Sequence, residues 1–224
     1  MNAFKILAGV LFTAAAVTAA PPTPSQTLER STEVLTDLQS IPLKGIPPKL
    51  LEDAEAVAII PRVIKAGFVI GGRGGHGLTL VRDNKGVWGE PTFVAIGGAS
   101  IGFQAGVQST DVVLVFHKRK SLDRVLDGKG KLTLGADAAI AAGPLGRQAA
   151  AATDGKLQAE IFSYSRSRGL FAGVSLDGAA LMNDTDANAS YKEIAGKPET
   201  VKSVVALLNK LQELSVETPA TPRK

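Results

Sequence analysis

The sequence predicts an α+β fold: a single domain with a curved, mostly antiparallel, glycine-rich sheet, half-barrel-like in shape and flanked by helices. Helical periodicity dominates the two ends of the chain. The middle is a series of short β-branched or alternating runs separated by Gly, Asp and Asn. The 224 residues include 24 glycines, and aromatic residues make up only 5%, so small side chains must do much of the packing. Strands bounded by helices are typical of an α+β domain.

Residues 1–19 have the features of a cleavable signal peptide. Lys5 supplies a positive charge, the apolar stretch ILAGVLFTAAAV follows, and small residues precede a cleavage site expected after Ala19. A retained membrane anchor is the alternative, but the apolar stretch is shorter than a bilayer span requires. We therefore expect an exported, periplasmic protein that is peripherally associated with the membrane. The sequence has no cysteine, which excludes disulfides and lipid attachment through cysteine.

Residues 20–45 are expected to form an N-terminal helix and a linker. A capping-box pattern with Pro24 at the first helical position opens the helix. Its sparse apolar stripe consists of Leu28, Leu35 and Leu38. Acidic residues on the same helix favour packing on the domain over contact with a membrane. A second, short helix begins at Pro47 and Pro48.

Residues 46–195 are expected to form the main domain, a meander of strands. The sequence DNKG, Asp83 to Gly86, predicts a hairpin turn between two of the strands. Residues 121–128 predict a helix capped by Ser121 and closed by Gly128. The small-residue segment 134–147 fits either a tight helix or a close-packed strand. The two runs on either side of RSRG are expected to be strands that pair with each other.

The chain is expected to close with a helix over residues 196–214 that packs on the domain, followed by a disordered tail over residues 215–224. Pro198 lies near the first helical position, and the tail is polar and contains proline. The apolar residues at helical spacing are Val201, Val204, Val205, Leu208 and Leu211.

Two motifs suggest enzymes, but their surroundings argue against that interpretation. Gly72, Gly74 and Gly77 have the G-x-G-x-x-G spacing of a dinucleotide loop, which requires a helix directly after the last glycine. The sequence that follows, LTLVRDNKGVW, predicts a strand and a turn instead. Ser100 lies in a G-x-S-x-G pattern, yet the sequence predicts that a strand continues where a nucleophile elbow needs a helix. We therefore expect no enzymatic activity.

Metal binding is also disfavoured by the pattern. Residues 184–190 begin like a calcium loop, but Ala189 replaces the required glycine and Ala195 the required glutamate. An Asx-rich turn is the better interpretation. His76 and His117 have no further ligand at a metal-binding spacing. No cofactor is expected.

Basic residues gather at the ends of predicted strands, where Arg and Lys suit anionic head groups if several converge. The candidate lipid-contacting residues are Lys118, Arg119, Lys120, Arg166 and Arg168, with Arg62, Lys65 and Arg73 as helpers. Glycines inside strands mark bends or close approaches of another backbone. The glycines expected to be structural are Gly67, Gly71, Gly72, Gly74, Gly97, Gly98 and Gly102.

Over residues 46–191 the chain resembles the SYLF domain family, which includes yeast actin-patch proteins, animal phosphoinositide-binding adaptors and exported bacterial proteins. The similarity is carried by KAGFVIGGRGGHG, WGEPTFVAIGGASIGFQAGVQSTDVV, LGADAAIAAGPLGR and YSRSRGLFAGVSLDGAAL. The resemblance implies lipid binding, of phosphatidylinositol lipids in eukaryotic members, and an actin-binding domain in the yeast branch. It implies no enzymatic activity. The predicted signal peptide separates this chain from both eukaryotic ligands, so only the module and anionic lipid in general carry over.

We therefore expect a non-catalytic module that binds anionic phospholipid head groups at the bacterial envelope. The alternative is a protein-interaction module similar to the actin-binding branch, which would hold a protein partner on the same small-residue surface. Nucleic acid is not an expected partner, because the net charge is only +4 and aromatic residues are scarce.

The charge-based hypothesis leads to a specific prediction. Neutralising Lys118, Arg119 and Lys120 should weaken vesicle binding far more than removing residues 20–40. If these charges do not determine vesicle binding, we expect an apolar pocket to make the contact instead. Its lining would be Phe93, Phe103 and Phe171.

Overall fold

The computed structural model describes residues 20–39, 45–67, 70–101, 106–143, 159–167, 170–173 and 176–216. The predicted signal peptide, most of the predicted tail and three residues named above therefore lie outside the described residues. The three residues are Gly102, Phe103 and Arg168.

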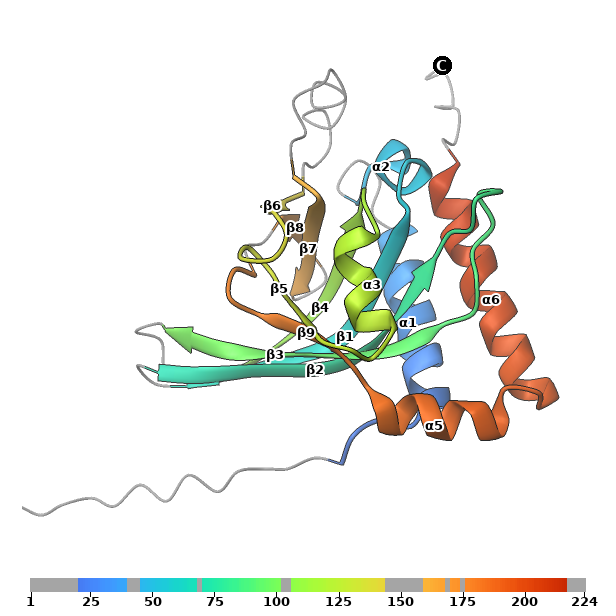
Figure 1. Ribbon diagram of the computed structural model, residues 1–224, viewed down its shortest axis with the longest axis horizontal. Coiled ribbons are helices and arrows are strands. Elements are labelled where there is room, and N and C mark those ends of the chain that lie inside the picture. Colours follow the sequence, from blue (N-terminus) through green and yellow to red (C-terminus); the bar gives the residue numbers. More distant parts are fainter. Residues whose placement is uncertain are drawn as a thin grey trace, which may run out of the picture.

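A single nine-stranded sheet organises the domain (Figure 1). The strand order is β5-β9-β3-β2-β1-β4-β7-β6, and β8 pairs with β7. All pairs are antiparallel except β6 with β7. The predicted α+β fold with a curved, mostly antiparallel sheet is confirmed. The strands are β1 Ala56–Gly67, β2 Ile70–Val81, β3 Thr92–Ile101, β4 Gly106–Phe116, β5 Lys131–Thr133, β6 Ile140–Ala142, β7 Ile161–Ser167, β8 Leu170–Gly173 and β9 Ala180–Asn183.

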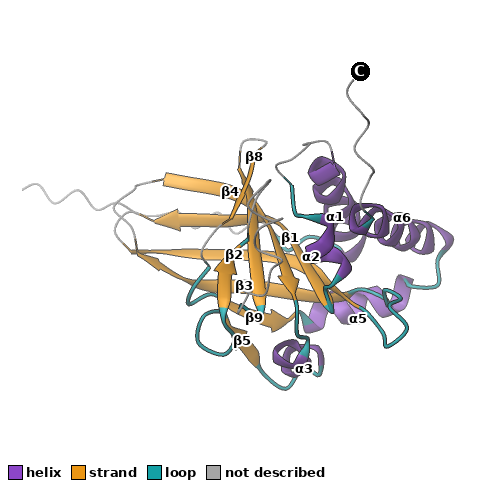
Figure 2. Ribbon diagram, turned by 90° about the horizontal axis from the view of Figure 1, so that it is seen from above, coloured by secondary structure: helices purple, strands orange, loops and turns teal. Residues whose placement is uncertain are grey.

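Helices cover both faces of the sheet, but unequally (Figure 2). Four of them pack on one face, which we call the helix side, and α3 packs on the other. The helices are α1 Pro24–Gln39, α2 Pro48–Glu52, α3 Lys120–Leu126, α5 Thr185–Ile194 and α6 Pro198–Ser215.

The alternation of side chains along the central strands builds two hydrophobic cores. Val57 and Ile59 of β1 point to the helix side, where they join buried residues of α1, α2, α5 and α6. Ala58 and Ile60 point to the opposite face and join the buried residues of α3. Because both faces are covered, the run AVAII of β1 is continuously apolar rather than alternating.

The N-terminal helix packs on the domain as expected. Leu28, Leu35 and Leu38 are all buried in the helix-side core. Thr23 and Gln26 exchange the two hydrogen bonds of the predicted capping box. The acidic residues of this helix lie on its outer side, lining a groove described below.

The predicted apolar face of the C-terminal helix is partly wrong. Val204 and Leu211 are buried, but Val201 and Val205 are 47% and 49% exposed. The buried face of α6 instead runs through Thr200, Val204, Leu207, Leu211 and Ser215. Polar Thr200 and Ser215 occupy buried positions at the two ends of the helix. The buried face predicted from the apolar residues alone is therefore shifted by about one residue from the buried face of α6.

Two further local predictions need correction. The helix predicted to be capped by Ser121 is α3, but its N-cap is Arg119, and the Ser121 hydroxyl donates to Glu160 instead. Residues 184–190 form no isolated Asx turn. Asp184 caps α5 by accepting a hydrogen bond from the Ala187 N–H, and the following residues continue as the helix. In the ambiguous small-residue segment, residues 135–137 form a turn and Ile140–Ala142 form strand β6.

The structure excludes the dinucleotide interpretation of the glycine motif. After Gly77 the chain continues in β2 to Val81 and then turns through Asp83 to Gly86. Ser100 likewise lies in strand β3. Within the described residues, no helix is long and apolar enough to cross a bilayer, and no group of His, Cys, Asp and Glu side chains could hold a metal ion.

Candidate functional site

The four long strands extend beyond the helices (Figures 1 and 2). We call this projecting part the arm and define it as residues 62–67, 70–75, 97–101 and 106–110. In the arm β2 pairs with both β1 and β3, and β1 pairs with β4. Most of the predicted structural glycines lie within it. Residues 68–69, between β1 and β2, and residues 102–105, between β3 and β4, lie outside the described residues.

The arm carries three of the predicted cations. Its described residues include no acidic side chain, but Asp111 follows its last β4 residue directly and lies beside Arg62. Lys65 and Arg73 lie directly opposite each other on β1 and β2, on the face opposite the helix side. Lys65 is exposed and Arg73 is half-buried. The Arg73 Nε is buried without a hydrogen-bond partner in the described part of the chain. Arg62 lies where the arm joins the body of the domain.

A β-bulge at Arg62 sets the arm's geometry. Both pairings of β1 shift register here, and Arg62 has a φ of 52°, a left-handed conformation that costs energy outside glycine. The Arg62 N–H donates to the Asp111 Oδ1 at 3.0 Å. This bond stabilises the bulge, so the backbone of Arg62 is structural while its side chain is exposed.

The helix side of the arm is apolar and uncovered. Strand alternation brings Ile64 and Val107 to this face, and they are 42% and 77% exposed. Met182 of neighbouring β9 is 38% exposed and lies within 3.6 Å of the position a side chain at Gly97 would occupy. The exposed glycines Gly72 and Gly74 complete this surface.

Arg166, predicted to contact lipid, is engaged in ion pairs. Its side chain is 24% exposed and bridges Asp37 of α1, with Asp111 of β4 3.6 Å away. The charge of Arg166 therefore ties the N-terminal helix to the sheet next to the bulge. Its predicted neighbour Arg168 lies outside the described residues.

The remaining predicted cations are far from the arm. Lys118, Arg119 and Lys120 are exposed and link β4 to α3. Arg119 donates from its side chain to Asp123 at 3.2 Å and from its backbone to Glu55 at 2.8 Å. Lys65 pairs with Gln108, near the other end of β4. At roughly 3.3 Å per residue, the length of β4 places about 30 Å between Lys65 and the residues Lys118 to Lys120. The structure thus brings Arg62, Lys65 and Arg73 into one region and Lys118 to Lys120 into another.

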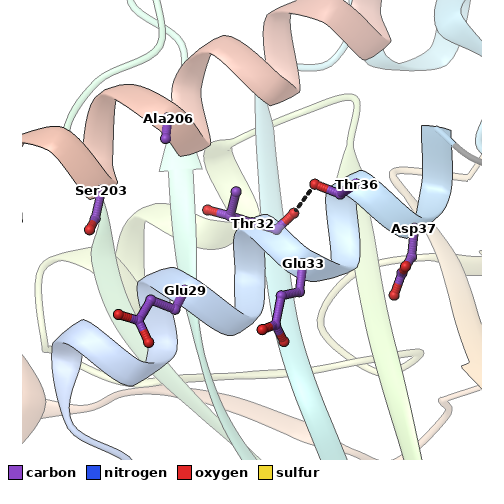
Figure 3. A pocket seen from close by; sticks show the side chains of 7 residues that line it. All are labelled: Glu29, Thr32, Glu33, Thr36, Asp37, Ser203 and Ala206. Carbon is purple, nitrogen blue, oxygen red and sulfur yellow. Dashed lines mark hydrogen bonds between the residues drawn. The ribbon is translucent and has the colours of Figure 1, made fainter.

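An open groove of about 550 Å³ lies between α1 and α6 (Figure 3). Three acidic side chains of α1 line it, together with two threonines, and α6 contributes only small residues. Its charge makes it unsuited to an anionic lipid. The lining residues are Glu29, Thr32, Glu33, Thr36, Asp37, Ser203 and Ala206.

The two histidines have structural surroundings. Burial lowers the pKa of His117, partly opposed by the carboxylates of Asp53 and Glu55, and its ring packs edge-on against Phe162. His76 lies on the helix side, where its Nδ1 is 2.7 Å from Asp184, the residue that caps α5. This contact fastens β2 to the start of α5.

The expected phenylalanine pocket finds no support at its one described side chain. Phe93 is 1% exposed in the helix-side core, where its ring lies 5.2 Å from that of Tyr191. Phe103 and the side chain of Phe171 lie outside what the structure describes.

Sequence reasoning missed the carboxylates that engage Arg166, and the exposed apolar face. The ion pair of Asp111 could not be inferred, because an acidic residue directly before the buried run VVLVF is typical of the end of a strand. Val107 and Ile64 could have been noticed, because alternation places both on the same face as Gly74.

The curved glycine-rich sheet and its projecting arm define the chain as an α+β half-barrel domain. Residues 97–211, just over half of the chain, match the family model described as Ysc84, Las17-binding protein actin regulator. The chain belongs to this family, which confirms the resemblance inferred from its motifs.

Several characterised proteins are similar to the chain. It is 41% identical over 149 residues to protein YSC84 of Saccharomyces cerevisiae, covering 65% of this chain and 31% of that protein. It is 38% identical over 148 residues to LAS seventeen-binding protein 3 of the same yeast, covering 65% and 32%. The SH3 domain-containing YSC84-like protein 1 of Bos taurus is 37% identical over 150 residues, covering 67% and 43%.

The match spans only about a third to two fifths of these relatives' own lengths. No solved structure matches the chain.

Proposed function

We propose that the protein is a non-catalytic protein-interaction module. The observation that carries this proposal is the family match, because the family description and one relative's name both refer to binding of another protein. This was the alternative in the sequence analysis, and the comparisons favour it over lipid binding. The exposed cationic turn at Lys118 to Lys120 gives such a partner an accessible, charged contact.

Co-sedimentation with filamentous actin tests this proposal, because the family description includes the words actin regulator. We expect the full chain to pellet with filaments at low ionic strength. A variant with Lys118, Arg119 and Lys120 all changed to Ala should pellet less, since its cationic turn is gone. The matched control changes three exposed lysines elsewhere, Lys192, Lys197 and Lys202, to Ala. A wild-type chain that stays in the supernatant over the whole concentration range would argue against an actin-type partner.

Association with anionic lipid head groups is a second candidate function. It is favoured by one feature, the cationic arm that carries no acidic residue among its described residues. Each basic residue near an anionic surface contributes about 1 kcal/mol, and salt screens the contribution within a Debye length. Sedimentation with phosphatidylserine-containing vesicles should exceed sedimentation with pure phosphatidylcholine, and the difference should shrink as salt is added. Equal sedimentation with both vesicle types would contradict this candidate.

Export to the periplasm is also a proposal, supported by the charge and apolar pattern of residues 1–19. Mass spectrometry of protein isolated from its native envelope fraction should find a chain that begins at Ala20. A chain isolated intact from Met1 would contradict the proposal.

A further inference from the structure

We propose that the edge of β4 within the arm binds an extended segment of a protein partner, which joins the sheet as an additional strand. The partner segment carries acidic side chains on the face opposite the helix side and apolar side chains on the helix side. This inference rests on the proposed protein-interaction function, for which it names a surface and the chemistry of the partner. It adds a contact at Val107 to Ser109 to the one at the cationic turn.

Along the arm, β4 is an edge strand. It pairs with β1 over Gly106–Phe116, but its pairing with β7 on the other side covers only Asp111–Phe116. On that side, no described residue pairs with β4 over 106–110. The side chains of Val107 and Ser109 are exposed, Val107 by 77%. Within the part of the chain that the structure describes, this edge is therefore open.

A hydrogen bond at the far end of β4 shows which backbone groups point toward this edge. The His117 N–H donates to the Glu160 carbonyl oxygen, on the side of β7. Successive residues of a strand direct their backbone groups to opposite neighbours, and the bulge in the β1–β4 pairing adds its extra residue to β1, so the alternation along β4 is regular. Val107 and Ser109 therefore direct their N–H and carbonyl groups to the edge, where an incoming strand can pair with them.

The sequence of this edge does not protect it against pairing. Edge strands of natural proteins usually carry a lysine, a proline, a bulge or an inward-pointing charge that discourages pairing with another strand. Residues 106–110, GVQST, have no charge and no proline. Such an edge is suited to β-strand addition, in which an extended peptide joins a sheet. The arm's other edge, at β3, is less accessible, because the chain at Gly178 and Ala179 already lies against Gly98.

The side chains beside the edge define the chemistry of the partner. A partner residue opposite Gln108 has its side chain on the same face as Lys65, which pairs with Gln108 across β1 and β4. Two strand spacings, about 10 Å, separate it from Lys65, and a glutamate and a lysine side chain together can span that distance. Lys65 and Arg73 form no ion pair within the described residues, so they are available to a carboxylate. The next partner residues point to the helix side, where exposed Val107 favours an apolar contact.

A second copy of the chain is a weaker candidate occupant of this edge. If two β4 edges paired antiparallel, Lys65 of both copies would lie on the same face of the joined sheet, and the two charges would repel each other. A partner segment with acidic side chains is attracted by the same cations. Charge complementarity therefore favours a different chain in which acidic and apolar residues alternate.

The probe is a short blocked peptide in which valine and glutamate alternate, added to the full chain. With its valine side chains on the helix side, the valine N–H groups point to β4 and the glutamate N–H groups point away from it. N-methylation of the valines should weaken binding by at least roughly tenfold, whereas N-methylation of the glutamates should leave it within about twofold. Both methylated peptides are tested on the unchanged protein, so the comparison does not depend on the folding of a variant.

Protein variants test the same contact from the other side. Lys65→Glu should weaken peptide binding by roughly threefold or more, and the matched control Lys192→Glu, at an exposed position of α5, by less than about twofold. Ser109→Pro removes an N–H that points to the edge and should weaken binding by roughly fivefold or more. Fluorescence anisotropy of the labelled peptide measures binding, and circular dichroism confirms that each variant is folded. Amide exchange followed by NMR should slow at Val107 and Ser109 when the peptide is bound.

Methylated peptides that bind alike, or a bound peptide that leaves exchange at Val107 and Ser109 unchanged, would overturn the proposal. A wild-type dimer that Ser109→Pro dissociates would also overturn it, because the edge would then belong to a second copy. Absence of peptide binding would do the same, and pelleting with actin filaments would then show that the proposed interaction function stands without this edge. Peptide binding at the edge without actin pelleting would support the proposal and argue only against an actin-type partner.

Discussion

Gly77, which the sequence placed in a nucleotide-binding spacing, is required for packing. A Cβ at this position would lie 2.2 Å from the Ile59 carbonyl oxygen and 2.7 Å from the Ile60 Cα, both of them backbone atoms of the neighbouring strand. Since backbone cannot move aside cheaply, we expect Gly77→Ala to lower the free energy of unfolding by about 3 kcal/mol or more. Urea denaturation measures the change.

The control for this prediction is Gly74→Ala in the same strand. Its Cβ would meet only the Ile96 carbonyl oxygen at 3.8 Å, an ordinary contact distance. We expect this variant to unfold within about 1 kcal/mol of wild type. Similar losses in the two variants would show that the close approach of β1 at Gly77 is not the cause.

His117 makes stability depend on pH. Burial lowers its pKa, so the unfolded chain binds a proton more readily than the folded chain. The free energy of unfolding should therefore be highest above the ordinary histidine pKa of about 6.5 and decrease as the pH falls through the range below it. His117→Phe, which keeps a ring against Phe162, should flatten the profile between about pH 7 and 5. Urea midpoints over this range measure the effect, and identical slopes in both proteins would contradict the assignment.

At the scale of elements, α1 is part of the core. Leu35 is fully buried among helix-side residues, so Leu35→Ala should cost about 2–5 kcal/mol. Glu33→Ala, at an exposed position of the same helix, should change stability by no more than about 0.5 kcal/mol. Thermal unfolding followed by circular dichroism compares the two, and equal melting temperatures would place α1 outside the cooperative unit. Deleting residues 20–40 would remove this core contribution, so it cannot serve as a test of lipid binding alone.

The secondary structure of these elements was predictable to different degrees. Alternation and turn residues identified the strands. Side chains point to opposite faces of a strand in turn, and Asp83 to Gly86 is a strong turn sequence. The exposed face of α6 was misjudged because Thr200 and Ser215, although polar, are buried there. Asp184 was taken for a turn residue because an Asp side chain accepts similar local hydrogen bonds when it caps a helix and when it forms an Asx turn.

For the whole molecule, the two cores should unfold together. They are separated by a single sheet whose central strands supply residues to both, such as Leu78 to the helix-side core and Leu114 to the opposite core. Leu78→Ala and Leu114→Ala should therefore each shift one common transition. Fluorescence of Trp88, in the helix-side core, and far-ultraviolet circular dichroism should report the same midpoint for each variant. A transition that differs between the two probes would show that the cores are independent.

The sequence by itself determined the fold class and the family. These depend on local periodicity, turn chemistry and motif context, all of which can be read along the chain. The tertiary structure decided which cations are engaged and which are available. Arg166 meets Asp37 and Asp111 from two other elements, whereas Lys65 and Arg73 form no ion pair within the described residues. Ion pairing depends on distances between residues far apart in the chain, and those distances exist only once β1, β4, β7 and α1 have packed together.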